Sequence, residues 1–355
     1  MQYEVKKGFV SLPKGCYIQL EKKASEVILA NIRRSFGDRA GLIARIETFT
    51  QDSGLPLSLK NFIGYYHLDP RSIYGKFSFS RLCADAGVCD DFAEPAESIL
   101  TKAFSKLVAV DSRRWIKFLT DILPHFSCEL AASLSDFEKR MLQMFYITVF
   151  QEAADWRSHT AQANMQLLAD SPIMMHELYG LLALNLERID FIDQPVPLGF
   201  DCPLDLHCTY TRDQILIAMD YMTPKNVREG VKWLPDKQVD VFFITLNKAD
   251  KDYSPTTMYN DYSINESLFH WQSQSTTSDT AGTGQRYINH RQRGSRVVLF
   301  VREFKQDSIG AAPYTCLGTA AYVKHTGSRP MNITWHLDQP IPAKYLRKTN
   351  KLVVG

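Results

Sequence analysis

The sequence lacks the motifs of several common enzyme classes. Its 355 residues hold no GxxxxGK[ST] loop for ATP phosphates, no HExxH zinc motif and no GxSxG nucleophile turn. The HxKxxxxD pattern of phospholipase-D-type nucleases is also missing. Gly282 and Gly284 predict a flexible hinge in a loop, without the following helix that a dinucleotide-binding fingerprint requires. These absences favour a binding protein over an enzyme.

Long apolar runs and paired cysteines are lacking too. No apolar run reaches the length of a membrane span, and the N-terminal residues lack the apolar core of a signal peptide, so we expect a cytoplasmic protein. The seven cysteines form no CxxC pair. Cys83 with Cys89, or Cys202 and Cys208 around His207, are conceivable metal ligands, but their spacing matches no standard zinc site. We therefore expect reduced, partly buried thiols, with no metal and no cofactor.

The net charge of +2 is too small to indicate nucleic-acid binding by itself. The position of the charges is more informative, because four arginines follow one another in the short segment QRYINHRQRGSR. Two interpretations remain open: a solvated turn between strands, or a loop that contacts phosphates. The arginines are Arg286, Arg291, Arg293 and Arg296.

The first part of the chain, residues 1–190, is predicted to be helical, beginning with an amphipathic helix at Glu21–Phe36. Ser135 and Glu138 have the spacing of a capping box before the apolar run MLQMFYITVF. Ser171 and Pro172 open another apolar helix, with proline at its favoured first position. Methionine and aromatic residues at this spacing are typical of a packed core, so we expect an all-helical domain.

The segment 191–207 contains three prolines and a glycine, which exclude a continuing helix and predict a linker. Beyond it, Thr211 and Gln214 have the spacing of a second capping box. Residues 208–355 also hold several runs rich in β-branched and aromatic residues, among them VDVFFITL, separated by turn signals. Some runs, such as VVLFV, are apolar at every position, which indicates a sheet covered on both faces. We therefore predict an α+β chain whose second domain contains a curved sheet or a small β-barrel.

The stretch Tyr253–Ser278, YSPTTMYNDYSINESLFHWQSQSTTS, mixes aromatic rings with amide, hydroxyl and carboxylate groups. It follows neither helical nor strand periodicity for long. Aromatic faces beside polar groups are suited to stacking on a planar ring and reading its edge. In a buried core, each of these polar groups would need a hydrogen-bond partner. The stretch therefore predicts a recognition surface.

Several strings together resemble the C-terminal region of SauUSI-like type IV restriction enzymes. They are LHCTYTRDQIL, FITLNKADKDYSPTTMYNDYSINESLFHWQSQSTTS, RYINH, VLFVRE, YTCLGTAAYVKHTGSRPMNITWHL and PIPA, between about Asp205 and Ala343. A looser similarity links the first part to the helical connector that follows the motor in these enzymes. The resemblance implies an SRA-like (SRA/PUA-like) domain that recognises 5-methylcytosine in double-stranded DNA. It also implies helicase and nuclease modules, in cis or in trans, whose motifs are missing here.

The resemblance and the chemistry of base recognition suggest roles for single residues. A flipped base is stacked between aromatic rings while its edge is hydrogen-bonded. Asp261 is the expected acceptor for the N4 amine, and Gln272 and Gln274 are expected at O2 and N3 or in the gap left in the duplex. The stacking candidates are Tyr259, Tyr262, Phe269 and Trp271, of which Phe269 and Trp271 have a core position as an equal alternative. Arg286, Arg291, Arg293 and Arg296 are expected to hold phosphates.

Two other functions remain open at this point. The first is a protein-interaction and oligomerisation module, which an exposed apolar stripe on Leu142–Phe150 would favour. The second is a nuclease with Asp261, Glu266 and His270 as metal ligands, although these residues have no known spacing. Whether the chain forms a homodimer is left open by the sequence.

Overall fold

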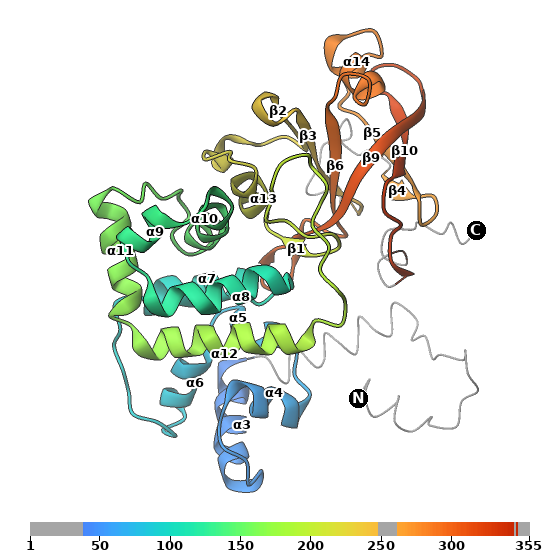
Figure 1. The fold of residues 1–355 in the computed structure, drawn as a ribbon. Coiled ribbons are helices and arrows are strands. Elements are labelled where there is room, and N and C mark those ends of the chain that lie inside the picture. The colour runs from blue at the N-terminus through green and yellow to red at the C-terminus, as the bar shows by residue number, and fades with distance from the viewer. Residues whose placement is uncertain (1–37, 248–260, 344–345, 347–355) are drawn as a thin grey trace, which may run out of the picture. The chain divides into compact units, whose positions relative to one another are not determined.

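The computed structural model describes residues 38–247, 261–343 and 346, and these form two compact units (Figure 1). The first unit comprises the described residues up to Val108 together with Asp170–Leu181. The second comprises Ala109–Ala169 and the described residues from Leu182 onward. The predicted helix Glu21–Phe36 and the candidate Tyr259 lie outside the described residues.

The first unit is helical, and its core is rich in aromatic side chains. Phe49 and Phe62 meet edge to face, with 5.9 Å between ring centroids. The buried carboxylate of Glu177 accepts hydrogen bonds from the backbone N–H groups of Phe79 at 2.5 Å and Ser80 at 2.8 Å. It therefore caps the helix that begins at Phe79, because the first N–H groups of a helix have no partner within it. The helices are α3 (Arg39–Asp52), α4 (Leu59–Tyr66), α5 (Arg71–Tyr74), α6 (Phe79–Asp85), α7 (Glu97–Leu107) and part of α12 (Pro172–Arg188).

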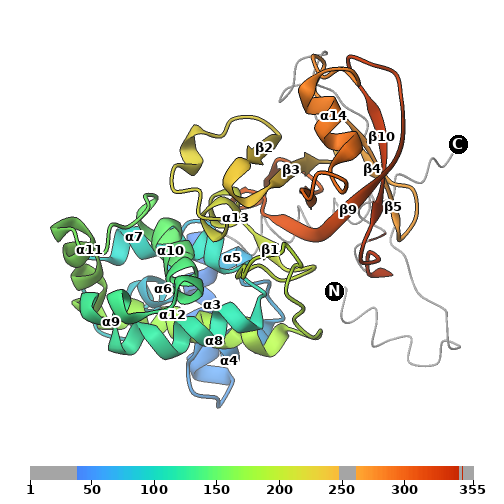
Figure 2. The same ribbon diagram turned by 45° about the horizontal axis from the view of Figure 1, so that its top comes forward.

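The second unit begins with helices. Both predicted capping boxes are present: Ser135 with Glu138 starts α10, and Thr211 with Gln214 starts α13. Helices α10 and α13 lie side by side in Figures 1 and 2, joined by a hydrogen bond of 2.8 Å from Gln214 Nε2 to Thr148 Oγ1. The helices are α8 (Arg113–Ile122), η1 (Leu123–His125), α9 (Cys128–Ser133), α10 (Asp136–Phe150), α11 (His159–Ala169), the rest of α12, α13 (Arg212–Ala218), η2 (Pro224–Asn226), η3 (Pro235–Lys237) and α14 (Gly282–Asn289).

The proline-containing segment 191–207 has no helix, as its prolines predicted, but it is packed into the second unit. Leu204 and Leu206 are buried. The carboxylate of Asp205 is fully buried and accepts a hydrogen bond of 2.6 Å from Ser112 Oγ. It also forms an ion pair of 2.7 Å with Arg114 at the start of α8. The segment is therefore held by specific polar contacts with α8.

A mixed sheet of eight strands forms the rest of the second unit. Its order is β2-β3-β6-β9-β10-β5-β4, with β1 paired to β9; β3 and β6 are parallel and the other pairs antiparallel. Among the described residues the first and last strands of this order, β2 and β4, do not pair with each other, so the sheet is open. The predicted α+β fold is confirmed, and the alternative of a closed β-barrel was wrong. The strands are β1 (Thr209–Tyr210), β2 (Val231–Leu234), β3 (Val239–Thr245), β4 (Tyr262–Ser263), β5 (Leu268–Gln272), β6 (Arg296–Arg302), β9 (Tyr314–Thr326) and β10 (Asn332–Leu337), with a separate pair β7 (Gln306–Asp307) and β8 (Gly310–Ala311).

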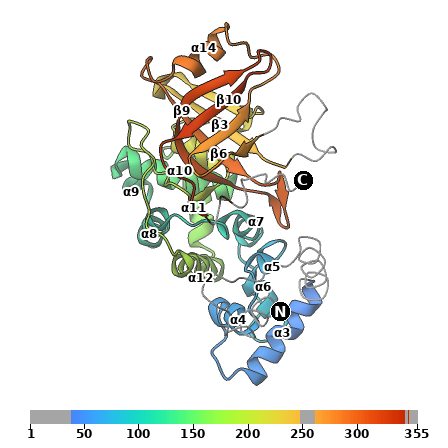
Figure 3. The ribbon, with the colours of Figure 1, turned by 90° about the vertical axis from the view of Figure 1, so that its right-hand side faces the viewer.

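Helix α14 covers one face of this sheet (Figures 2 and 3). The expectation of a loop hinge at Gly282 and Gly284 was wrong, because α14 begins at Gly282. Two glycines are poor helix formers, but Tyr287 of the same helix is 1% exposed and packs into the core of the sheet. Tertiary packing therefore outweighs the local preference.

Candidate nucleic-acid interface

Strand β5 divides the predicted base-pocket residues between the two faces of the sheet. Phe269 is 0% and Trp271 5% exposed, whereas Gln272 is partly exposed. Successive side chains of a strand point to opposite faces. Phe269 and Trp271 therefore lie on one face and Gln272 on the other, so the strand does not bring these predicted residues together.

Phe269 and Trp271 belong to the core beneath α14, which is the alternative that the sequence left open for them. Trp271 packs on Phe242 of β3 with 4.2 Å between ring centroids, and on Tyr287 of α14 with 5.6 Å. Trp335 of β10 completes the cluster at 5.7 Å from Phe242. Each of these rings has ring neighbours instead of an open face, so in this conformation the cluster is packed core.

The opposite face carries polar and aromatic side chains in register across four strands. His270 of β5 lies opposite Tyr262 of β4 and Thr334 of β10. Thr334 in turn lies opposite Lys324 of β9. Directly opposed residues share a face of the sheet. A second row on the same face pairs Asn332 of β10 with Gln272 of β5 and with Thr326 of β9. We call the surface formed by both rows the polar face; its residues are Tyr262, His270, Gln272, Lys324, Thr326, Asn332 and Thr334.

The chemistry of the polar face suits a nucleic acid. The rings of Tyr262 and His270 are stacked, with 4.8 Å between centroids and 15° between their planes. Lys324 supplies an exposed ammonium group, and none of the residues of the polar face has a carboxylate. Amide and hydroxyl groups of the remaining residues can both donate and accept hydrogen bonds. The face therefore combines aromatic rings, edge-reading groups and a positive charge.

Asp261 and Gln274 flank this region and are occupied by neighbouring groups. Asp261 is 2% exposed, and its Oδ1 accepts the backbone N–H of Gln272 at 2.9 Å. Gln274 Nε2 donates to Glu229 at 3.1 Å, and Gln274 Oε1 accepts from Thr277 at 3.3 Å. In this conformation Asp261 contributes to the joining of β4 and β5, and Gln274 ties the end of β5 to residues near β2.

Arg286 is paired with a buried carboxylate that was not among the predicted site residues. Its Nε and Nη2 donate to the two oxygens of Asp240 at 2.7 and 2.9 Å, and its guanidinium lies 4.4 Å from the ring centroid of Trp233. Asp240 is 0% exposed on β3, and burial raises the pKa of its carboxyl, an effect that the hydrogen bonds from Arg286 partly offset. Arg286 therefore anchors α14 to the sheet.

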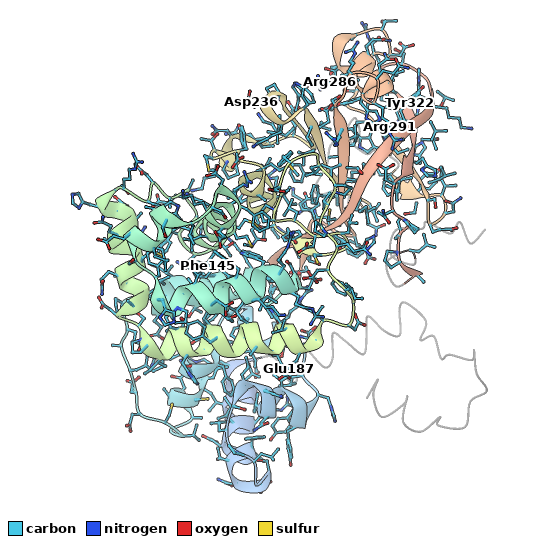
Figure 4. The ribbon with its side chains drawn as sticks, viewed as in Figure 1. Phe145, Glu187, Asp236, Arg286, Arg291 and Tyr322 are labelled. Carbon is cyan, nitrogen blue, oxygen red and sulfur yellow. The ribbon has the colours of Figure 1, made fainter. Side chains whose placement is uncertain are left out.

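The other predicted phosphate-binding arginines differ in their surroundings. Arg291, which is labelled in Figure 4, forms an ion pair with Asp338, which follows β10. The guanidinium of Arg296 packs against the backbone of Gly199, where an added Cβ would lie 2.5 Å from Nη2. Arg293 is exposed, and among the described residues no carboxylate forms an ion pair with it. Arg293 is thus the member of this set whose charge is most available to a phosphate.

The metal-ligand arrangement considered for a nuclease is not formed. Within the described ranges, no group of three or more histidine, cysteine, aspartate or glutamate side chains is placed to hold a metal ion. Asp261 and His270 lie on opposite faces, because Asp261 directly precedes Tyr262, the residue paired with His270. None of the described helices is long and apolar enough to cross a membrane. Cys89 is exposed, whereas Cys83, Cys202, Cys208 and Cys316 are buried free thiols.

Sequence reasoning missed Asp240, Trp233 and Lys324 as parts of this region. Asp240 interrupts the otherwise apolar run VDVFFITL, and a carboxylate inside a buried strand was a usable signal of an ion pair. Its partner, however, lies 46 residues further along the chain. The position of Lys324 depends on an irregularity of β9 that no local pattern shows.

A family model described as "Domain of unknown function (DUF3427)" matches residues 204–348. The matched segment contains the mixed sheet and α14, and with them the polar face and the Arg286–Asp240 pair. A search of curated proteins finds no match.

Proposed function

We propose that the second unit binds DNA and recognises a modified cytosine of the 5-methylcytosine type. The observation that supports DNA binding best is the stacked pair of Tyr262 and His270 in register with Lys324 across four strands. Stacking on aromatic rings contributes about 1–3 kcal/mol per base. Lys324, two strands away from His270 in the same row, adds the attraction to the phosphates that dominates affinity.

The choice of a modified cytosine rests on the resemblance to SauUSI-like restriction enzymes and their SRA-like domain. In the proposal, Tyr262 and His270 stack on the extruded base, and Gln272 reads its edge. Phe269 and Trp271 support the sheet from the core side, and Asp261 holds the β4–β5 pair in place.

The proposal assigns the chain a targeting role in a type IV restriction or phage-defence system, in the cytoplasm. Strand separation and cleavage would come from helicase and nuclease modules, in cis or in trans. An exposed apolar stripe on Leu142–Phe150 would have favoured the oligomerisation alternative. Residues Met141–Val149 of helix α10 are buried, so this support for the alternative is missing.

The test is a binding titration of the whole chain with duplexes that differ only at C5 of one cytosine: methyl, hydroxymethyl or hydrogen. We expect the methylated duplex to bind most tightly, and all affinities to fall as salt rises because phosphate contacts release counterions. Equal affinity for the three duplexes would overturn the recognition of modification while leaving DNA binding intact. Absence of salt-sensitive binding to any duplex would overturn the whole proposal.

A further inference from the structure

The hairpin formed by β9 and β10 carries two exposed cations, Lys324 near the end of β9 and Arg329 in the turn. Within the part of the chain that the structure describes, neither forms an ion pair with a carboxylate. Arg286 and Arg291, by contrast, are paired with Asp240 and Asp338. The hairpin therefore has positive charge available for a partner that supplies the negative charge.

A bulge in β9 directs Lys324 to the polar face. Lys324 lies opposite Thr334, but Tyr322 lies opposite Trp335, so Val323 between them has no partner on β10. In a regular strand Tyr322 and Lys324 would point to the same face. The extra residue changes this alternation. Tyr322 faces the core beside Trp335, while Lys324 joins the row of His270 and Tyr262.

The turn that carries Arg329 is held in place by the loop before α14. The backbone N–H of Arg329 donates to Thr277 O at 3.1 Å, and Ser328 Oγ donates to Asp279 Oδ1 at 2.9 Å. Arg329 has a φ of 62°, a left-handed conformation that costs a non-glycine residue about 1 kcal/mol or more. The backbone at the turn is therefore fixed, and only the long side chain of Arg329 remains to adapt to a ligand.

We infer that this hairpin contacts the phosphates of a DNA strand that crosses the polar face, an inference that rests on the proposed function. Lys324 and Tyr262 are three strand spacings apart, or about 14 Å at roughly 4.8 Å per spacing. With a rise of about 3.4 Å per nucleotide in a B-form strand, this distance spans about four nucleotides. A base on the Tyr262–His270 pair and a phosphate at Lys324 can thus belong to the same strand. Arg329, beyond the end of β9, continues the line of positive charge.

The test measures the slope of log Kd against log salt concentration for the whole chain and the variants Lys324→Gln, Arg329→Gln and their combination. Each lost phosphate contact should lower the slope by about 0.9. It should also weaken methylated and unmethylated duplexes by the same factor. Lys117→Gln, which removes an exposed lysine from α8, is the matched control and should leave the slope unchanged. Lys324→Arg keeps the charge and should restore the wild-type slope.

The outcomes separate this inference from the function on which it rests. If the wild-type chain binds DNA and the double variant has an unchanged slope, the hairpin makes no phosphate contact and the inference is wrong. Loss of methyl discrimination without a change in slope would also overturn it, since that pattern indicates contact with the base. If the wild-type chain does not bind DNA, the proposed function itself fails. Equal thermal unfolding midpoints show that the variants are folded.

Discussion

The ring of Tyr262 lies nearly parallel to that of His270, 4.8 Å away on the neighbouring strand. The two residues are directly opposed in the β4–β5 pair, so the backbone hydrogen bonds of the pair fix their spacing. Both side chains are partly exposed. A stacked pair fixed by the sheet loses little further conformational entropy when a third ring is added, which is favourable for binding a base.

Replacement of Tyr262 by alanine should therefore weaken DNA binding. Loss of one stacking contact is worth about 1–3 kcal/mol, which corresponds to an increase in Kd of roughly 5- to 150-fold. Fluorescence anisotropy with a labelled methylated duplex measures this change. Phe304→Ala is the control, because Phe304 is a 45% exposed aromatic residue outside the polar face. A similar loss in both variants, or in neither, would contradict a specific role for the stack.

Replacement of Asp240 by asparagine should strongly destabilise the second unit. It leaves Arg286 with no charged partner in a largely buried site, and breaking such a pair typically costs about 3–5 kcal/mol. The free energy of unfolding from urea titration measures the effect. Asp236→Asn, at an exposed carboxylate of η3, should change stability by less than about 0.5 kcal/mol. In Asp240→Leu with Arg286→Met, both charges are absent, and most of the stability should return; a double variant as unstable as Asp240→Asn would argue against an ion-pair origin.

The buried ring of His290 should make the stability depend on pH. Its Nδ1 is 3.3 Å from the Ser295 carbonyl, and its Nε2 accepts the backbone N–H of Tyr322 at 3.2 Å, so both contacts are satisfied by the neutral ring. Burial lowers the pKa of His290 below its ordinary value of about 6.5. The unfolded chain therefore takes up a proton before the folded chain does. Stability should fall as the pH decreases below about 6.5, down to the lowered pKa of the folded state.

Unfolding of the wild type and of His290→Gln at several pH values between about 5 and 8 tests this sign. Glutamine carries no titrating group, so the variant should lose this part of the pH dependence whatever its overall stability. An identical slope in both proteins would mean that other groups cause the pH dependence.

Gly318 should be intolerant of alanine for two separate reasons. Its φ is 86°, and an added Cβ would lie 2.5 Å from Leu206 Cδ2. The backbone conformation alone costs about 1 kcal/mol, and the overpacking adds about 1–3 kcal/mol. Gly294→Ala isolates the first contribution, because Gly294 has a φ of 70° with nothing within 4 Å of an added Cβ. If thermal unfolding shows equal losses for the two variants, the contact with Leu206 does not matter.

Local patterns predicted the helices and strands whose signals lie within a few residues. The capping boxes at Ser135 and Thr211 and the strand of Val239 are of this kind, because a cap or an apolar run acts over one or two turns of chain. Helix α14 was missed since its first turn contains two glycines and its stability comes from Tyr287 in the core. That contact depends on residues far away in the sequence.

The sequence pointed to the stretch that holds Tyr262, His270 and Gln272, but not to the way in which these residues are arranged on the sheet. Strand alternation applied to Phe269 and Gln272 would have separated them, and this signal was present in the sequence. The pairing of Arg286 with Asp240 and the bulge at Val323 depend on partners in other strands, which no local pattern identifies. Tyr259 stays a prediction, as does the role of Arg293 at a phosphate.

The burial of Asp205 against α8 limits how the segment matched by the family model, residues 204–348, can be exchanged between proteins. Asp205 and Tyr210 lie near the start of the matched segment, yet their contacts, Ser112 and Trp115, precede it by about a hundred residues. A recombination event at residue 204 would transfer the sheet without the helix that neutralises Asp205, leaving a buried charge unpaired. Helices α8 and α10 and the sheet should thus be inherited together. Relatives of this chain are expected to change jointly at Ser112, Arg114 and Asp205.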